Sequence, residues 1–149
     1  MKIELRKVAK KDWDSILNLR NQFYENFFYE QKEPILKDDH YKYMNKQESN
    51  PNFHQWIAFY GKDDVGYIRI LDQDINIMVE KKFQSRGIGT IMLNLVEKKA
   101  LNLGIKKLKA IVIAGNESSK KIFIKNNFKL IKRIIRHNQK MYSFEKEIS

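Results

Sequence analysis

Residues 79–90 read Val-Glu-Lys-Lys-Phe-Gln-Ser-Arg-Gly-Ile-Gly-Thr and join a predicted strand to the most regular helical pattern of the chain. A turn that leads directly into a helix exposes backbone N–H groups without intrahelical partners, and the helix dipole adds partial positive charge there. A diphosphate fits such a site. Gly87 and Gly89 allow close backbone approach, while Gln84 and Arg86 offer side-chain donors. The predicted anion-binding turn comprises Gln84, Ser85, Arg86, Gly87, Ile88, Gly89 and Thr90.

The context of this turn narrows the class of ligand. The GxxxxGK[ST] spacing of a P-loop is missing, and the preceding strand follows a meander instead of opening a Rossmann unit. Nucleoside triphosphate and dinucleotide binding are therefore disfavoured. A helix start with no ligand also produces two glycines at this spacing, so the glycines alone do not decide the function.

The elements next to the turn have clear periodicities. Three β-rich runs precede it, at 55–60, 65–71 and 75–79, and the turn composition between them predicts an antiparallel meander. From Gly87, apolar residues recur at helical spacing until Gly104. The β-branched run 107–114 follows, and such a strand-helix-strand unit predicts a right-handed crossover to a parallel neighbour.

The two ends of the chain complete a mixed α/β pattern. A strand is predicted at 3–8, a helix from Asp12, and a second short helix from Lys37 that ends before Pro51. A last helix at 116–126 precedes a closing hairpin at 128–136 and 141–148. The predicted order is β-α-α-β-β-β-α-β-α-β-β, a single α/β domain that spans residues 1–149.

Composition excludes several function classes. The chain has 149 residues and no cysteine, so disulfides, thiolate metal sites and a cysteine nucleophile are excluded, and we expect no metal site. No apolar run is long enough to span a bilayer, and the N-terminal residues lack the apolar stretch of a signal peptide. We therefore expect a soluble, cytoplasmic protein.

The formal net charge is +11. This charge favours anionic partners, although a lysine-rich source genome explains it equally well. No helix-turn-helix, zinc or RNP-type signature accompanies it, so dedicated nucleic-acid binding is not expected.

The turn resembles motif A of the GNAT family of N-acetyltransferases, whose pattern Gln/Arg-x-x-Gly-x-Gly/Ala matches at Gln84, Gly87 and Gly89. The resemblance extends over nearly the whole chain and implies the GNAT fold. This fold is a mixed sheet of about seven strands whose fourth strand is bulged and splays from the fifth, with flanking helices. It further implies acetyl-CoA as the acetyl donor, with its pantetheine arm paired to the backbone near Ile77, Met78 and Val79.

A second family landmark is Asn-x-x-Ala-x-x-x-Tyr-x-x-x-Gly-Phe, which here reads Asn116, Ser119, Phe123, Asn127 and Phe128. The resemblance places Asn116 and Phe123 beside the donor. Family members often carry a tyrosine at the position of Phe123 that protonates the leaving thiolate, and phenylalanine has no proton to give. A core aromatic on an amphipathic helix is the simpler interpretation of Phe123.

Acetyl transfer to an amine needs a base, a polarised carbonyl and a proton donor for the thiolate. Asp74 lies where many relatives carry a glutamate base, although an Asp at a strand start is also a common turn cap. His40 titrates near neutral pH and is a second candidate. A backbone N–H, expected at Val79, polarises the carbonyl, and Tyr142 or water is the expected proton donor.

The segments 19–21 and 35–40 are similar to the N-terminal pattern of acetyltransferases that act on nucleotide-linked amino sugars. The expected acceptor is therefore a small-molecule amine, with a UDP-linked amino sugar as the leading example. The alternatives are a peptide N-terminus, a ribosomal protein, a polyamine, or a non-catalytic module that only binds CoA. We expect a monomer or a homodimer.

Overall fold

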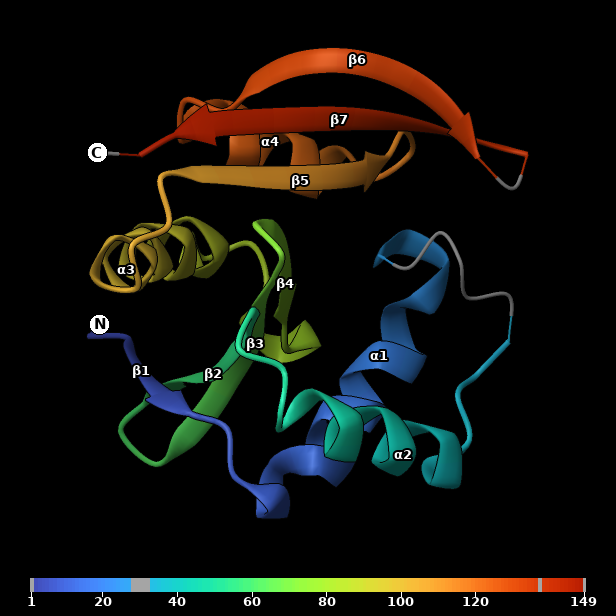
Figure 1. The fold of residues 1–149 in the computed structure, drawn as a ribbon, viewed down its shortest axis with the longest axis vertical. Helices are drawn as coiled ribbons and strands as arrows, with labels where there is room; N and C mark the ends of the chain where they lie inside the picture. The colour runs from blue at the N-terminus through green and yellow to red at the C-terminus, as the bar shows by residue number, and fades with distance from the viewer. Residues whose placement is uncertain (1, 28–32, 137, 149) are drawn as a thin grey trace.

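The computed structural model describes residues 2–27, 33–136 and 138–148 (Figure 1). The strands are β1 (Glu4–Lys7), β2 (Phe53–Tyr60), β3 (Asp63–Leu71), β4 (Asp74–Val79), β5 (Lys107–Ile113), β6 (Lys129–Arg136) and β7 (Gln139–Glu147). The helices are α1 (Trp13–Phe27), α2 (Lys37–Gln47), α3 (Ile88–Asn102) and α4 (Glu117–Lys125), with short 3₁₀ turns η1 (Lys10–Asp12) and η2 (Lys81–Phe83). The predicted order of strands and helices is confirmed.

The strands form one seven-stranded sheet in the order β1-β2-β3-β4-β5-β7-β6. Every neighbouring pair is antiparallel except β4 and β5, which are parallel and are connected through α3. Figure 1 shows β5, β7 and β6 together at the top and β1 to β4 below them. The predicted mixed α/β sheet is confirmed.

Strands β1 to β4 are joined to strands β5 to β7 only by a short pairing of β4 with β5. Strands β4 and β5 pair only at Asp74 and Lys109, near the start of both strands. Their carboxyl ends diverge, and this confirms the splay that the family resemblance implies. The divergence leaves one edge of β4 available to other partners.

The expected bulge in β4 is wrong. Strand β4 pairs with β3 in unbroken register from Asp74 to Val79. The register shift lies between β2 and β3 instead, where Ala58 is opposite Gly66 and Phe59 is opposite Asp64, so Val65 is the extra residue. A bulge on the neighbouring strand twists the ladder at the same level.

The helices cover opposite faces of the sheet (Figure 1). Helix α3 buries Met92, Leu93 and Val96 completely against one face, and burying each such side chain contributes about 1.5–3 kcal/mol. On the other face Trp13 of α1 and Met44 of α2 form a separate apolar cluster with strand residues. The two cores fix α1 and α3 on either side of β4.

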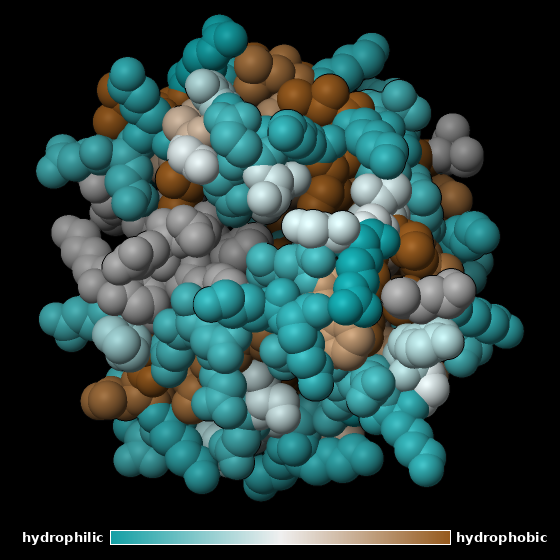
Figure 2. Space-filling view, turned by 180° about the vertical axis from the view of Figure 1, so that it is seen from behind, coloured by the Kyte–Doolittle hydropathy of each residue, from teal (hydrophilic) through white to brown (hydrophobic). Residues whose placement is uncertain are grey.

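The surface carries mainly polar side chains. Figure 2 shows hydrophilic residues over most of the face opposite to that of Figure 1, with apolar groups scattered among them. None of the helices in the described ranges is long and apolar enough to cross a membrane.

Candidate functional site

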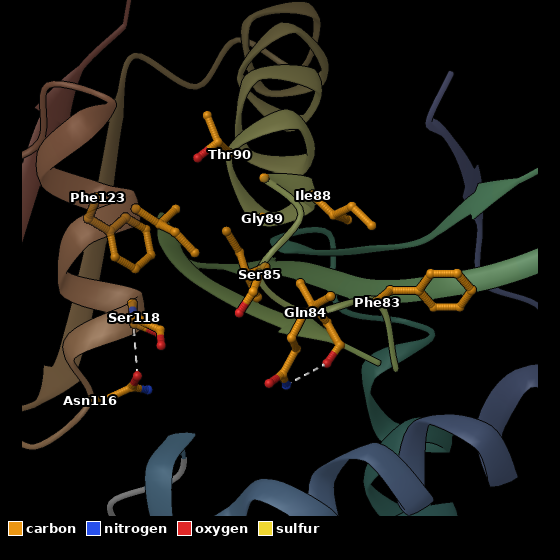
Figure 3. Close-up of a pocket in the computed structure, with 14 residues that line it drawn as sticks. Phe83, Gln84, Ser85, Ile88, Gly89, Thr90, Asn116, Ser118 and Phe123 are labelled. Atoms are coloured by element: carbon orange, nitrogen blue, oxygen red, sulfur yellow. Dashed lines mark hydrogen bonds between the residues drawn. The ribbon is translucent and has the colours of Figure 1, made fainter. Parts of the chain in front are cut away.

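A cavity of about 300 Å³ lies where the end of β4, the start of α3 and the inner face of α4 meet (Figure 3). It is lined by Ile77, Val79, Phe83, Gln84, Ser85, Gly87, Ile88, Gly89, Thr90, Asn116, Ser118, Ser119, Ile122 and Phe123. Most residues predicted to contact the donor are therefore brought together. Met78 and Arg86 lie outside this lining.

The N-terminus of α3 forms one end of the cavity. Ser85 and Gly87 have left-handed backbone conformations, with φ of +63° and +77°, which turn the chain sharply into the helix. The first-turn N–H groups, at Ile88, Gly89 and Thr90, have no intrahelical partners and carry the positive end of the helix dipole. The hydroxyls of Ser85 and Thr90 add further donors at this end. The arrangement suits a diphosphate.

The free edge of β4 forms one wall of the cavity. The Glu80 N–H donates to the Val65 carbonyl at 2.8 Å, which makes Gly66 and Val79 a pair without direct ladder hydrogen bonds. Because the pattern alternates, Ile77 and Val79 direct their N–H and C=O groups away from β3 and toward the gap. Met78 directs its groups toward Tyr67 on β3.

A smaller cavity of about 20 Å³ continues into the gap between β4 and β5. It shares Ile77, Asn116, Ser119 and Phe123 with the large cavity. The remaining lining residues are Ile75, Asn76, Ile111 and Val112. The two cavities therefore form one path from the α3 N-terminus to the middle of the sheet.

The residues of this path fit CoA. One end offers clustered N–H and hydroxyl donors for phosphates, the middle has apolar walls from Ile77, Ile122 and Phe123, and the β4 edge offers backbone groups for an amide arm. The hydrogen-bonding groups and apolar walls of the path thus match a ligand with an anionic end and a long, mostly apolar arm.

Gly89 has a packing role in this wall. A Cβ atom at this position would lie 2.6 Å from Cδ1 of Ile122 and 3.9 Å from Cγ2 of Val79. The missing side chain lets α4 approach α3 closely. A side chain at position 89 would therefore first displace Ile122, which itself lines the cavity.

Helix α4 presents Asn116, Ser119 and Phe123 to the path. Asn116 is the N-cap, and its Oδ1 accepts a hydrogen bond from the Ser119 N–H at 3.2 Å. Phe123 is only 5% exposed and packs against Phe128 and Phe144, with ring centroids 5.0 and 6.3 Å away. Phe123 therefore combines a core role with a place in the cavity wall.

Asp74 lies at the closed end of the gap, at the β4–β5 bridge. Its side chain is 37% exposed, and Oδ2 is 3.4 Å from Nη1 of Arg69. Burial raises the pKa of the Asp74 carboxyl above its usual value, and the positive charge of Arg69 offsets part of that rise. Asp74 does not line either cavity, so a water would have to connect it to a bound amine.

His40 lies away from the path, buried between α2 and α1. Its Nε2 is 2.8 Å from the Trp13 carbonyl oxygen, so this nitrogen donates, and Nδ1 lies 3.5 Å from Nη1 of Arg20. Burial lowers the pKa of His40 and favours the neutral imidazole. The geometry gives His40 the role of a link between two helices.

Tyr142 also lies outside both cavities. It is opposite Val112 on β5 and Arg133 on β6. The Lys120 Nζ is 4.8 Å from its ring centroid and the Arg133 guanidinium carbon is 5.8 Å from it. The ring is held between two cations at the side of α4.

Strands β3 and β4 carry a layer of polar side chains on the face of the sheet that packs against α1 and α2. Tyr67 donates to Oε1 of Gln55 at 2.8 Å, and burial raises the pKa of Tyr67. Arg69 is opposite Asn76, whose buried Oδ1 has no hydrogen-bond partner among the described residues. Burial and the nearby Arg69 lower the pKa of Arg20.

Five residues of the site were not predicted from the sequence: Phe83, Ser118, Ser119 and Ile122 of the large cavity, and Asn76 of the gap. The i, i+3 and i+7 spacing of Asn116, Ser119 and Phe123 is the signal that could have placed Ser119, because these positions share one helix face. In the described part of the chain, no group of three or more His, Asp or Glu side chains is placed to hold a metal ion.

Known proteins share both this sequence pattern and this fold. A profile of the acetyltransferase (GNAT) family matches residues 13–128. An uncharacterized protein of Methanocaldococcus jannaschii is 28% identical over 140 residues, which cover 89% of this chain and 29% of that protein. A Bacillus subtilis protein with the provisional name phosphinothricin acetyltransferase is 26% identical over 109 residues, covering 64% of each. The chain thus spans less than two thirds of the length of either relative.

A solved structure with the same fold contains CoA. Spermidine N-acetyltransferase from Vibrio cholerae, in complex with CoA and spermine, superposes with a TM-score of 0.87 and 15% identity. The match covers 98% of this chain and 95% of the other. At this identity the likeness shows the fold alone.

Proposed function

This chain belongs to the acetyltransferase (GNAT) family, and from this membership we propose that it transfers an acetyl group from acetyl-CoA to the amine of a small-molecule acceptor. The observation that carries the proposal is the continuous path from the N-terminus of α3 to the gap between β4 and β5. Acetyl-CoA supplies an activated thioester when it is bound.

Different residues of the path bind different parts of acetyl-CoA. The first-turn N–H groups of α3, with Ser85 and Thr90, hold the diphosphate, while the edge of β4 at Ile77 pairs with the pantetheine arm. The Val79 N–H, which points into the gap, polarises the thioester carbonyl. Asn116 supplies a side-chain amide at the mouth of the gap.

Asp74 is the base in this proposal. An acceptor amine must be neutral to attack, so a group near the gap must take its proton. Burial raises the pKa of Asp74 and thereby makes its carboxylate a stronger base. Since Asp74 lies beyond the cavity lining, it acts through a water molecule.

We propose an acceptor that carries negative charge. Arg69 of β3 is the ion-pair partner of Asp74, and Arg20 of α1 lies near enough to Arg69 for that charge to lower its pKa. The net charge of +11 attracts anions and repels a polycation. A nucleotide-linked amino sugar, which the sequence predicts, and an anionic amino acid such as phosphinothricin both fit this requirement. A polyamine, the substrate named for the Vibrio cholerae structure, is the alternative.

An acceptor panel tests the proposal. The purified chain is incubated with acetyl-CoA and, separately, with a UDP-linked amino sugar, phosphinothricin, spermidine and an N-terminal peptide, and acetylated products are detected by mass spectrometry. We expect product with an anionic amine. Product with spermidine alone would support the polyamine alternative, and CoA binding without any product would support a non-catalytic module.

A further inference from the structure

None of the described residues that line the two cavities is a tyrosine. When the bond between the acetyl carbon and sulfur breaks, its electron pair stays on sulfur and an anion forms. Phe123, at the position where relatives often carry a tyrosine, offers no O–H group. Another donor in the gap must stabilise this anion, or the anion leaves unassisted.

Ser119 is the hydroxyl residue placed for this role. It lines both the large cavity and the smaller one inside the gap, together with Phe123. Ser85, Thr90 and Ser118 line only the large cavity. Among the described residues that line the gap, Ser119 is the only one with a hydroxyl.

Helix α4 holds Ser119 in this position. Ser119 lies one turn before Phe123, so both side chains project from the same helix face. The Asn116 side chain caps the Ser119 N–H at 3.2 Å and fixes the backbone at the helix start. The positive end of the α4 dipole lies at this first turn and favours an anion nearby.

Building on the proposed function, we propose that the Ser119 hydroxyl donates a hydrogen bond to the sulfur of CoA as the carbon–sulfur bond breaks. The new carbon–nitrogen bond forms at the same carbonyl, and the amine proton goes to the base. Ser119 keeps its own proton, because an alcohol is a far weaker acid than a thiol. The sulfur leaves as a hydrogen-bonded thiolate and takes a proton from solvent.

The first test measures binding and does not depend on turnover. The thiolate absorbance of bound CoA is titrated against pH in the natural protein, in Ser119→Ala and in the control Ser118→Ala. The Ser119→Ala substitution keeps the main-chain N–H that Asn116 caps, so helix α4 should be preserved. Circular dichroism checks that the fold is unchanged. We expect the bound thiol in the Ser119→Ala protein to titrate about one pH unit higher than in the natural protein. Desulfo-CoA should bind equally to all three proteins.

The second test measures turnover and rescue. We expect Ser119→Ala to lower kcat about tenfold with little change in KM for acetyl-CoA. Ser118→Ala, which removes a hydroxyl from the large cavity but not from the gap, should lower kcat by clearly less. Phe123→Tyr in the Ser119→Ala background should restore turnover, because it returns an O–H group to the gap.

Three results would overturn the proposal. An unchanged thiol titration in Ser119→Ala would show that the hydroxyl does not contact sulfur. Equal effects of Ser118→Ala and Ser119→Ala would point to a general change of the cavity. Failure of the natural protein to bind CoA would remove the proposed function as well, whereas the first two results would leave that function intact.

Discussion

The side-chain amide of Gln84 donates a hydrogen bond to the main-chain carbonyl of Val79, with 3.1 Å between Nε2 and the oxygen (Figure 3). This bond ties the turn that precedes α3 to the last residue of β4. It satisfies the Val79 carbonyl and leaves the N–H of Val79 facing the gap. The anion-binding turn and the proposed carbonyl-polarising group are therefore held in one unit.

Replacing Gln84 with methionine should loosen this unit. The hydrogen bond is worth about 0.5–1.5 kcal/mol, so we expect kcat/KM for acetyl-CoA to fall about two- to tenfold while the fold stays intact. Gln84→Arg keeps a donor at this position and should retain most of the activity. If both variants behave alike in steady-state kinetics, the bond to Val79 has no functional role.

Gly89→Ala should narrow the cavity. The new Cβ would lie 2.6 Å from Cδ1 of Ile122, so this side chain must move within the cavity wall. We expect the Kd for CoA, measured by calorimetry, to rise about tenfold, equivalent to about 1.4 kcal/mol. Adding Ile122→Val removes Cδ1 and should recover affinity. Gly115→Ala, where a Cβ meets nothing within 4 Å, is the control. Unchanged affinity in Gly89→Ala would show that the ligand does not use this wall.

The pH dependence of kcat/KM should follow the ionisation of the Asp74 carboxyl. Burial raises the pKa of this carboxyl. The rising limb of kcat/KM should therefore lie at a higher pH than that at which an aspartate usually ionises. Arg69→Met removes the charge that favours the carboxylate, and the limb should move to higher pH. Asp74→Asn should remove the limb and lower turnover about 100-fold. A limb that stays in place in Arg69→Met would contradict the role of Asp74.

The raised pKa of the Asp74 carboxyl also predicts how the free energy of unfolding changes with pH. The folded state of this protein binds the Asp74 proton more tightly than the unfolded state does, because burial raises the pKa. The Asp74 contribution therefore favours folding at low pH and is lost as pH rises from the unfolded to the folded pKa. Urea unfolding of Asp74→Asn should lack this component, and an identical pH dependence in both proteins would contradict it.

Asn76→Leu should separate stability from activity. The buried Oδ1 of Asn76 has no partner among the described residues, and such an atom destabilises the fold by about 1–3 kcal/mol. Leucine has a similar size, so we expect a gain of about 1 kcal/mol in the free energy of unfolding. Turnover should fall, because an acceptor amine in the gap would lose this oxygen as its hydrogen-bond acceptor. A less stable protein with full turnover would refute both expectations.

The fold was largely predictable because each element leaves a local signal. The apolar spacing from Ile88 onward predicts α3, and Gly104, with φ of +80°, ends it as expected. The position of β7 between β5 and β6 was not predicted, since strand neighbours depend on contacts between distant residues. The helix predicted from Asp12 begins at Trp13, and the Asp12 carboxylate accepts hydrogen bonds from Arg6 and from the Ala9 N–H, each at 2.8 Å.

The site was predictable where it is local. The turn from Gln84 to Thr90 is contiguous, so its chemistry could be interpreted from residue order alone. Ser119 and Ile122 reach the cavity only because α4 packs beside α3, and His40 is withdrawn by the packing of α2 on α1. The backbone groups of Met78 point toward β3, whereas those of Ile77 and Val79 point toward the gap. This difference depends on the strand register, which the sequence does not specify to one residue.

Amine-dependent release of CoA tests the central claim most directly. The chain contains no cysteine, so a thiol reagent detects released CoA without a background from the protein. We expect acetyl-CoA to release thiol in proportion to acetylated amine when an anionic amine is present, and Gly89→Ala to need more acetyl-CoA for the same rate. Equal thiol release with and without every amine of the panel would contradict the assignment of this chain as an N-acetyltransferase.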